Sequence, residues 1–99
     1  MDVNDRIRKA LSAAPVVLFM KGTPEFPQCG FSAQTASALG HLGARFHHVN
    51  IFEDPELREA LKRYSNWPTY PQLYVNGELI GGCDIVLEMY SSGELKQVL

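Results

Sequence analysis

Residues 16–32, which read VVLFMKGTPEFPQCGFS, decide the fold. Positions 16–20 form a continuous apolar run that begins with two valines, which is typical of a strand buried on both faces of a sheet. A glycine and two prolines within residues 21–28 indicate a loop. Cys29 follows, and apolar residues at helical spacing after it predict a helix that begins near Gly30 and ends between Gly40 and Gly43. The stretch therefore predicts strand, loop and helix, with a cysteine at the start of the helix.

The flanking sequence supplies the remaining elements. We expect a helix behind an Asp2 cap that stops before Pro15, a strand over 46–51, a helix from the Asp54-Pro55 cap to about Tyr64, a hairpin of 72–75 and 78–80 around Asn76-Gly77, and a last helix over 84–90 with a short turn after Gly93. Two strand–helix–strand units followed by a hairpin predict an α/β fold, with a mixed sheet covered by helices on both faces.

Composition limits the function. The 99 residues are 45% hydrophobic and carry a net charge of −2, so broad binding to nucleic acid or to an anionic membrane is not expected. The acidic start lacks the basic-then-apolar order of a leader peptide, so we expect none, and the longest apolar run, residues 15–20, is far too short to span a bilayer. Two cysteines are too few for a secreted disulfide framework. These features predict one domain over residues 1–99, in the cytoplasm, with reduced thiols.

Cys29 is the leading candidate for chemistry. The start of a helix carries unpaired N–H groups and partial positive charge, which stabilise a thiolate, and Lys21 in the preceding loop adds to this field. The alternative is a small cysteine that only packs. Residues 29–32 read CGFS, so the position one turn after Cys29 is Ser32 and a dithiol exchange within the motif is excluded.

Two other segments have an open interpretation. Tyr70-Pro71 precedes a strand and is a candidate cis bond that would present the Tyr70 backbone to an extended, peptide-like ligand, although the tripeptide alone favours an ordinary turn. Residues 81–84, GGCD, suit the approach of a carboxylate to backbone N–H groups, or equally a turn in which Asp84 caps the helix. Cys83 is more typical of a packed residue than of a nucleophile.

Four segments together resemble monothiol glutaredoxins of the Cys-Gly-Phe-Ser type: 21–24 (KGTP), 29–32 (CGFS), 67–72 (WPTYPQ) and 81–84 (GGCD). They occur in the order of the family, and the resemblance covers nearly the whole chain. The eight positions from Lys21 to Cys29 are also similar to this class, whose loop is longer than that of dithiol glutaredoxins. The resemblance implies a thioredoxin-like (glutaredoxin) fold with a four-stranded mixed sheet.

The resemblance also implies a glutathione site. Pro71 would be the cis-proline, and the Tyr70 backbone would pair with the cysteinyl part of glutathione. Lys21 and Arg58 would hold its glycine carboxylate.

The γ-glutamyl end of glutathione would bind at the last helix. The N–H groups of Cys83 and Asp84 would hold its carboxylate, and the Asp84 side chain would hold its amine. Two cations, a strand edge and a helix start suit a dianionic tripeptide.

Counting ligands shows why such a protein would need help to bind a [2Fe–2S] cluster. The cluster takes four ligands, usually thiolates, whereas this chain has two cysteines. Cys29 and Cys83 from two chains would supply four, but the resemblance implies Cys29 from each of two chains with the thiols of two glutathiones. We prefer the second arrangement, because Cys83 at a carboxylate-binding turn should present its backbone.

The resemblance thus implies a homodimer bridged by a cluster and two glutathiones, which stores clusters and transfers them to apo iron–sulfur acceptors in iron–sulfur maturation and iron homeostasis. It also implies a BolA-family partner that contributes a histidine ligand. The alternative function is a weak glutathione-dependent thiol–disulfide oxidoreductase that removes glutathione from mixed disulfides, with Cys29 as the nucleophile. A third reading is an interaction module with an idle thiol.

Overall fold

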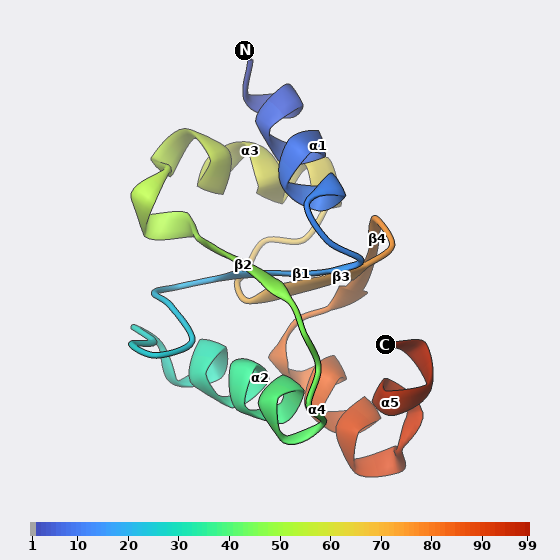
Figure 1. The fold of residues 1–99 in the computed structure, drawn as a ribbon. Coiled ribbons are helices and arrows are strands. Elements are labelled where there is room, and N and C mark those ends of the chain that lie inside the picture. The colour runs from blue at the N-terminus through green and yellow to red at the C-terminus, as the bar shows by residue number, and fades with distance from the viewer. Residues whose placement is uncertain (1) are drawn as a thin grey trace.

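A computed structural model describes residues 2–99 as a four-stranded mixed sheet between two layers of helices (Figure 1). The elements are α1 (Val3–Ser12), β1 (Val16–Met20), α2 (Gly30–His41), β2 (His47–Asn50), the 3₁₀ turn η1 (Ile51–Glu53), α3 (Pro55–Ser65), β3 (Gln72–Val75), β4 (Glu78–Gly81), α4 (Cys83–Ser92) and α5 (Glu94–Val98). The strand order is β2-β1-β3-β4, with β2 parallel to β1 and both other pairs antiparallel. The predicted α/β class, the mixed sheet and its helical cover on both faces are confirmed.

The predicted helix caps are also found. Asp2 accepts a hydrogen bond from the Asp5 N–H, and Asp54 accepts one from the Leu57 N–H with Pro55 in the first turn of α3. Both carboxylates therefore satisfy a backbone donor that the helix itself leaves unpaired.

Three expectations near the ends of elements were wrong. The strand predicted over 46–51 is shorter, because the Asn50 side chain accepts the Phe52 N–H at 3.0 Å and turns the chain into η1. The last helix begins at Cys83 rather than at Asp84, and the expected turn after Gly93 is the helix α5, which buries Leu95 completely. Gly93 separates the two helices with a φ of 84°.

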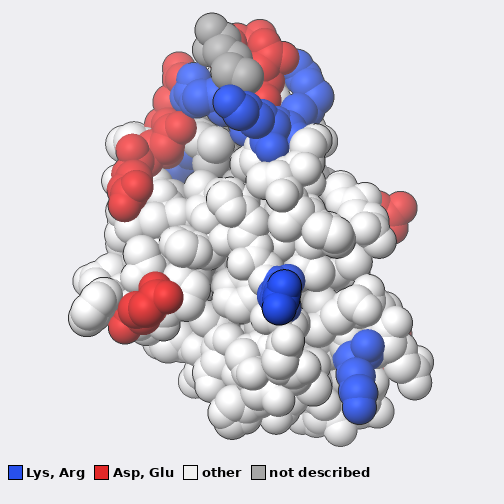
Figure 2. Space-filling view, in the orientation of Figure 1, with Lys and Arg blue, Asp and Glu red and all other residues white. Residues whose placement is uncertain are grey.

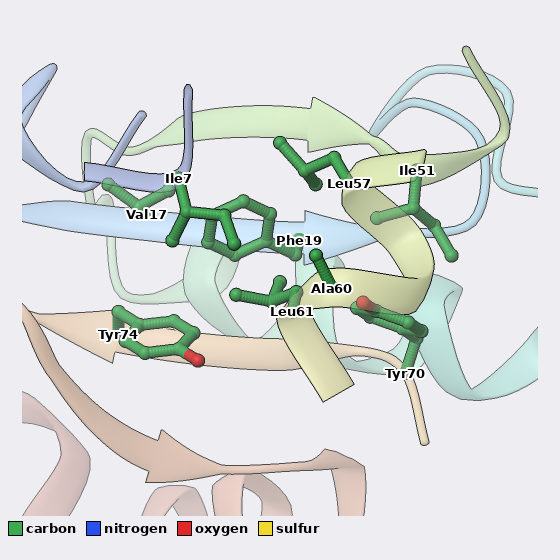
Figure 3. Packing of buried hydrophobic residues seen from close by; sticks show 9 residues of the cluster. All are labelled: Ile7, Val17, Phe19, Ile51, Leu57, Ala60, Leu61, Tyr70 and Tyr74. Atoms are coloured by element: carbon green, nitrogen blue, oxygen red, sulfur yellow. The ribbon is translucent and has the colours of Figure 1, made fainter. Parts of the chain in front are cut away.

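Strand β1 divides the core into two parts. Val17 and Phe19 pack on one face of the sheet with residues of α1 and α3, as Figure 3 shows. Leu18 and Met20 pack on the other face with residues of α2, α4 and α5. All five residues of β1 are buried, which explains its continuous apolar run and confirms the prediction of a strand covered on both faces.

The topology gathers four segments at one end of the sheet. In the antiparallel pair of β1 and β3, Phe19 lies opposite Gln72, so the end of β1 meets the start of β3. In the next pair Leu73 lies opposite Gly81, which brings the end of β4 and the start of α4 to the same place. The loop 21–28, the start of α2, the segment 66–71 and the start of α4 therefore lie around one end of the sheet.

Charged side chains are unevenly distributed over the surface. In the view of Figure 2 they gather over α1 and α3, where Arg6 pairs with Asp54 at 3.2 Å and with Glu56 at 2.5 Å, and they are sparse over the lower layer of helices. No helix within residues 2–99 combines the length and the apolar character that crossing a membrane requires.

Candidate functional site: a thiol at a helix start beside a pocket

Cys29 is the N-cap residue of α2. Its backbone is extended, with φ −156° and ψ 136°, and its carbonyl accepts the Ala33 N–H at 2.9 Å. The side chain is partly exposed and closes no capping hydrogen bond. The backbone N–H groups of Ser32, then of Phe31, nevertheless lower the pKa of Cys29 against an opposing effect of partial burial, and the charge of Lys21 acts in the same direction. The pKa of Cys29 is therefore lowered, the direction expected of a thiol at a helix start.

Ser32 occupies the position where a second thiol would stand. Its side chain is completely buried, and its hydroxyl oxygen accepts the Lys21 N–H at 3.1 Å. This bond fixes the end of β1 against the first turn of α2. Our sequence analysis noted only that Ser32 is not a cysteine, so this structural role was missed.

Hydrogen bonds from its backbone N–H groups hold the loop between Lys21 and Cys29. The Gln28 N–H donates to the Lys21 carbonyl at 2.8 Å, and the Gly22 N–H donates to the side-chain oxygen of Asn50 at 3.0 Å. Gly22 has a φ of 92°, and a Cβ there would lie 2.5 Å from the Phe26 carbonyl oxygen, so only glycine fits. At the tip of the loop Phe26 is 76% exposed.

A pocket of about 540 Å³ lies at this end of the sheet, a size typical of small-molecule sites. Of the residues that the resemblance implies for glutathione, five line it: Lys21, Tyr70, Pro71, Cys83 and Asp84. Cys29 is not among the lining residues, but Phe31 of the same helix turn is. The pocket therefore adjoins the first turn of the helix that Cys29 caps.

Tyr70 contributes backbone rather than side chain to the site. The Tyr70–Pro71 bond is cis, as the resemblance implied. The Tyr70 side chain is 5% exposed, and its hydroxyl donates to the Arg58 carbonyl at 2.7 Å. Burial raises the pKa of Tyr70, so the hydroxyl stays protonated. Because the side chain is anchored in the core with α3 (Figure 3), the backbone is left to face the pocket.

Arg58 is not among the residues that line the pocket. Its guanidinium lies 5.4 Å from the centre of the Phe52 ring, and its buried Nε has no hydrogen-bond partner within residues 2–99. The structure thus does not bring Arg58 to the pocket with Lys21, and its part in holding a carboxylate stays a prediction.

The start of α4 forms another wall of the pocket. Gly82 is the N-cap and has no side chain to satisfy the first N–H groups, so the reading of Asp84 as the cap was wrong. Cys83 is 7% exposed, and its Sγ donates to the Gln34 side-chain oxygen at 3.7 Å. The first N–H groups of a helix have no partner within it, which makes this wall suited to an anion.

Sequence reasoning missed two members of the site. Trp67 lines the pocket, and its buried indole N–H has no hydrogen-bond partner within residues 2–99. Gln72 is completely buried behind the pocket wall. The available signal for Gln72 was a lone polar residue at the start of an otherwise apolar strand.

No group of three or more His, Cys, Asp or Glu side chains within residues 2–99 is arranged to hold a metal ion. The chemistry that this end of the sheet offers is that of one accessible thiol beside a pocket with a cationic and an N–H-rich wall.

This arrangement is that of a glutaredoxin. Residues 16–80 match the Glutaredoxin family, and the chain belongs to it. Within the family the chain is a monothiol glutaredoxin of the Cys-Gly-Phe-Ser type, similar to Glutaredoxin 4 of Escherichia coli K12 with 52% identity over 95 residues, which cover 96% of this chain and 83% of that protein. It is 56% identical over 101 residues to mitochondrial Monothiol glutaredoxin-5 of Saccharomyces cerevisiae, covering 99% of this chain and 67% of the yeast protein.

Solved structures agree with this assignment. Reduced apo GrxS14 of poplar superposes with a TM-score of 0.83 at 53% identity, covering 96% of this chain and 87% of that chain. A buckwheat glutaredoxin in complex with glutathione superposes with a TM-score of 0.86 at 25% identity, covering 98% of this chain and 86% of that chain. The thioredoxin-like glutaredoxin fold implied by the sequence is thereby confirmed.

Proposed function

We propose that this chain is a glutathione-dependent carrier that binds, stores and transfers [2Fe–2S] clusters in iron–sulfur protein maturation and iron homeostasis. The observation that carries the proposal is one partly exposed thiol, Cys29, with a lowered pKa, while Ser32 is buried where a resolving thiol would stand. A thiolate that has no internal partner remains available as a ligand.

The pocket beside Cys29 fits glutathione by its chemistry. Lys21 offers a cation, the Tyr70 backbone offers a peptide edge, and the start of α4 offers N–H groups that no side chain caps. Asp84 in the first turn is exposed and would pair with an amine. Bound glutathione would supply the thiol that the chain itself lacks.

Four ligands would then come from two copies of the chain. Each copy would contribute Cys29 and one bound glutathione, so the carrier would hold its cluster as a homodimer. Cys83 is excluded from the ligand set because its sulfur is buried and bonded to Gln34. A BolA-family protein would replace the second copy and contribute a histidine, and apo iron–sulfur proteins would receive the cluster. We place this activity in the cytoplasm.

A second function rests on the same lowered pKa of Cys29. The thiolate would attack a glutathione mixed disulfide, forming a Cys29–glutathione disulfide and releasing the other thiol. A second glutathione would attack that disulfide, which frees Cys29 and leaves oxidised glutathione. We expect this turnover to be weak, since the motif Phe31-Ser32 and the long loop suit cluster ligation better than rapid exchange.

The test is reconstitution without air from iron, sulfide and glutathione. We expect a visible-absorbing protein that elutes as a dimer, and no such species when glutathione is omitted or when Cys29 is replaced by serine. Equal cluster binding by the Cys29→Ser variant would refute the proposal. Turnover of a small mixed disulfide at the rate of a dithiol glutaredoxin would instead favour the enzymatic function.

A further inference from the structure

We propose that Gln72 is a positioning residue for the glutathione site: it holds the wall formed by residues 67–71 in the shape that the ligand requires. The inference rests on the proposed function, since it explains what holds the glutathione pocket in its shape. Gln72 itself is completely buried and does not line the pocket.

The Gln72 side chain connects the pocket wall to the core. Its Nε2 donates to the Trp67 carbonyl at 3.1 Å and to the Thr69 carbonyl at 3.2 Å. Its Oε1 accepts the Tyr74 hydroxyl at 3.0 Å. Both Trp67 and Thr69 line the pocket, whereas Tyr74 is 2% exposed and packs against Phe19 in the core.

The two backbone carbonyls fix which way the Gln72 side-chain amide points, and the Tyr74 hydroxyl bonds to its other end. Burial raises the pKa of Tyr74 to about 12, so its hydroxyl remains a donor at neutral pH. A carbonyl only accepts, so the carbonyls of Trp67 and Thr69 require the Nε2 of Gln72 to face them, which leaves its Oε1 to accept from the Tyr74 hydroxyl. Tyr74 is the one titratable side chain within residues 2–99 that hydrogen-bonds to Gln72.

The wall needs this support because it has no regular structure of its own. It connects α3 to β3, and at its start the Trp67 N–H is held by the Ser65 hydroxyl at 3.1 Å and by the Lys62 carbonyl at 3.2 Å. In a regular strand, N–H groups of the neighbouring strand would donate to the carbonyls. Here the Gln72 side chain donates to the carbonyls of Trp67 and Thr69 instead. Without it the Thr69 carbonyl would lose its donor and the Trp67 carbonyl would keep only the longer bond from the Ser65 hydroxyl, at 3.5 Å, so the wall would move to find other donors.

Two substitutions of similar volume distinguish the donor of the Gln72 side chain from its acceptor. Gln72→Met removes donor and acceptor. Gln72→Glu keeps the acceptor for Tyr74 but turns a carboxylate towards two carbonyls. We expect each to weaken the binding of reduced glutathione about tenfold at pH 7.5, because two hydrogen bonds to the backbone carbonyls of the pocket wall are lost. Tyr74→Phe, which leaves the Gln72 Oε1 without its donor, should weaken binding about threefold.

The binding readout is built into the site, because Trp67 is the single tryptophan of the chain and lines the pocket. Its fluorescence during titration with glutathione, checked by calorimetry, gives the Kd. Lowering the pH from 7.5 to 5 should partly restore the affinity of Gln72→Glu, since a protonated carboxyl donates again, and should leave Gln72→Met unchanged. A purely structural loss would not follow this profile.

Leu95→Val in α5 is the matched control. Leu95 is completely buried but packs on the other face of the sheet from Tyr74, so this variant should lose stability in urea and keep the native Kd. The inference is overturned if the Gln72 and Tyr74 variants bind glutathione as the unsubstituted chain does, or if Leu95→Val weakens binding as much as they do. Failure of the unsubstituted chain to bind glutathione would instead overturn the proposed function, and this inference with it.

Discussion

Cys29 and Cys83 each stand at the start of a helix at the same end of the sheet, but they differ by one position in the helix register. Cys29 is the N-cap of α2, where an extended backbone lets a side chain meet the N–H groups of the second and third helical residues, Phe31 and Ser32. The N–H of Ser32 is the largest cause of its lowered pKa, and the N–H of Phe31 acts in the same direction. Cys83 is the first residue of α4, and its sulfur is buried against Gln34. The register of the helix start thus decides whether a residue offers its side chain or its backbone to a ligand.

The largest effect should separate the two thiols by their rate of alkylation. Cys29 should react with iodoacetamide at neutral pH, and Cys83 should react about 100-fold more slowly if reaching it takes a local opening of roughly 3 kcal/mol. Because the pKa of Cys29 is lowered, its reactivity should persist below the pH at which an ordinary thiol is protonated, and should fall only as the pH drops through that lowered pKa. Mass spectrometry measures the rate of Cys83 in the Cys29→Ser variant and the rate of Cys29 in the Cys83→Ser variant. Equal rates would show that the two thiols do not differ as proposed.

The loop that precedes Cys29 should fail if Gly22 acquires a side chain. Gly22→Ala forces alanine to a φ of 92° and into the Phe26 carbonyl, so we expect a loss of about 2 kcal/mol or more in urea unfolding. Gly40→Ala is the control: it lies within α2 with open space around it, and should gain about 0.5–1 kcal/mol. Similar values for the two would contradict the account of the loop.

Ser32→Ala should cost about 1–3 kcal/mol of stability, because it leaves the Lys21 N–H without its partner. It should also raise the pKa of Cys29, to which the Ser32 hydroxyl contributes. Thermal unfolding and the pH profile of alkylation measure the two effects. An unchanged melting temperature would show that the buried hydroxyl does not hold the end of β1.

The smallest expected effect belongs to Lys21. Lys21→Met removes a positive charge and should raise the pKa of Cys29, slowing alkylation at pH 7 roughly two- to fivefold, as for a surface interaction of about 0.5–1 kcal/mol. High salt should slow the unsubstituted chain in the same way and leave the variant unaffected. A faster reaction of the variant would contradict the account, because it would mean that the charge of Lys21 does not favour the Cys29 thiolate.

The sequence predicts local features of this molecule well and side-chain networks poorly. The apolar run of β1, the Asn76-Gly77 turn and the Asp54-Pro55 cap act within a few residues, and each was interpreted correctly. The shortening of β2 depends on one bond of the Asn50 side chain. The helix α5 depends on burial of Leu95 in the core, and this burial cannot be predicted from a segment as short and polar as residues 94–98.

The same limit applies to the site. Cys29 is recognisable from local chemistry at a helix start, whereas local chemistry left the segments around Tyr70 and Cys83 open and the resemblance assigned them to the site. The support from Gln72 and the absence of Arg58 from the pocket lining depend on contacts between elements, and spacing along the chain carries no information about them.

The central claim is that Cys29 alone, with borrowed thiols, carries the cluster. Native mass spectrometry of protein reconstituted without air tests it most directly, because the mass counts chains, clusters and glutathiones in one species. We predict two chains, one [2Fe–2S] cluster and two glutathiones, for the unsubstituted chain and for Cys83→Ser alike. A dimer that holds the cluster without glutathione and loses it in Cys83→Ser would contradict the account, since all four ligands would then be cysteines of the two chains.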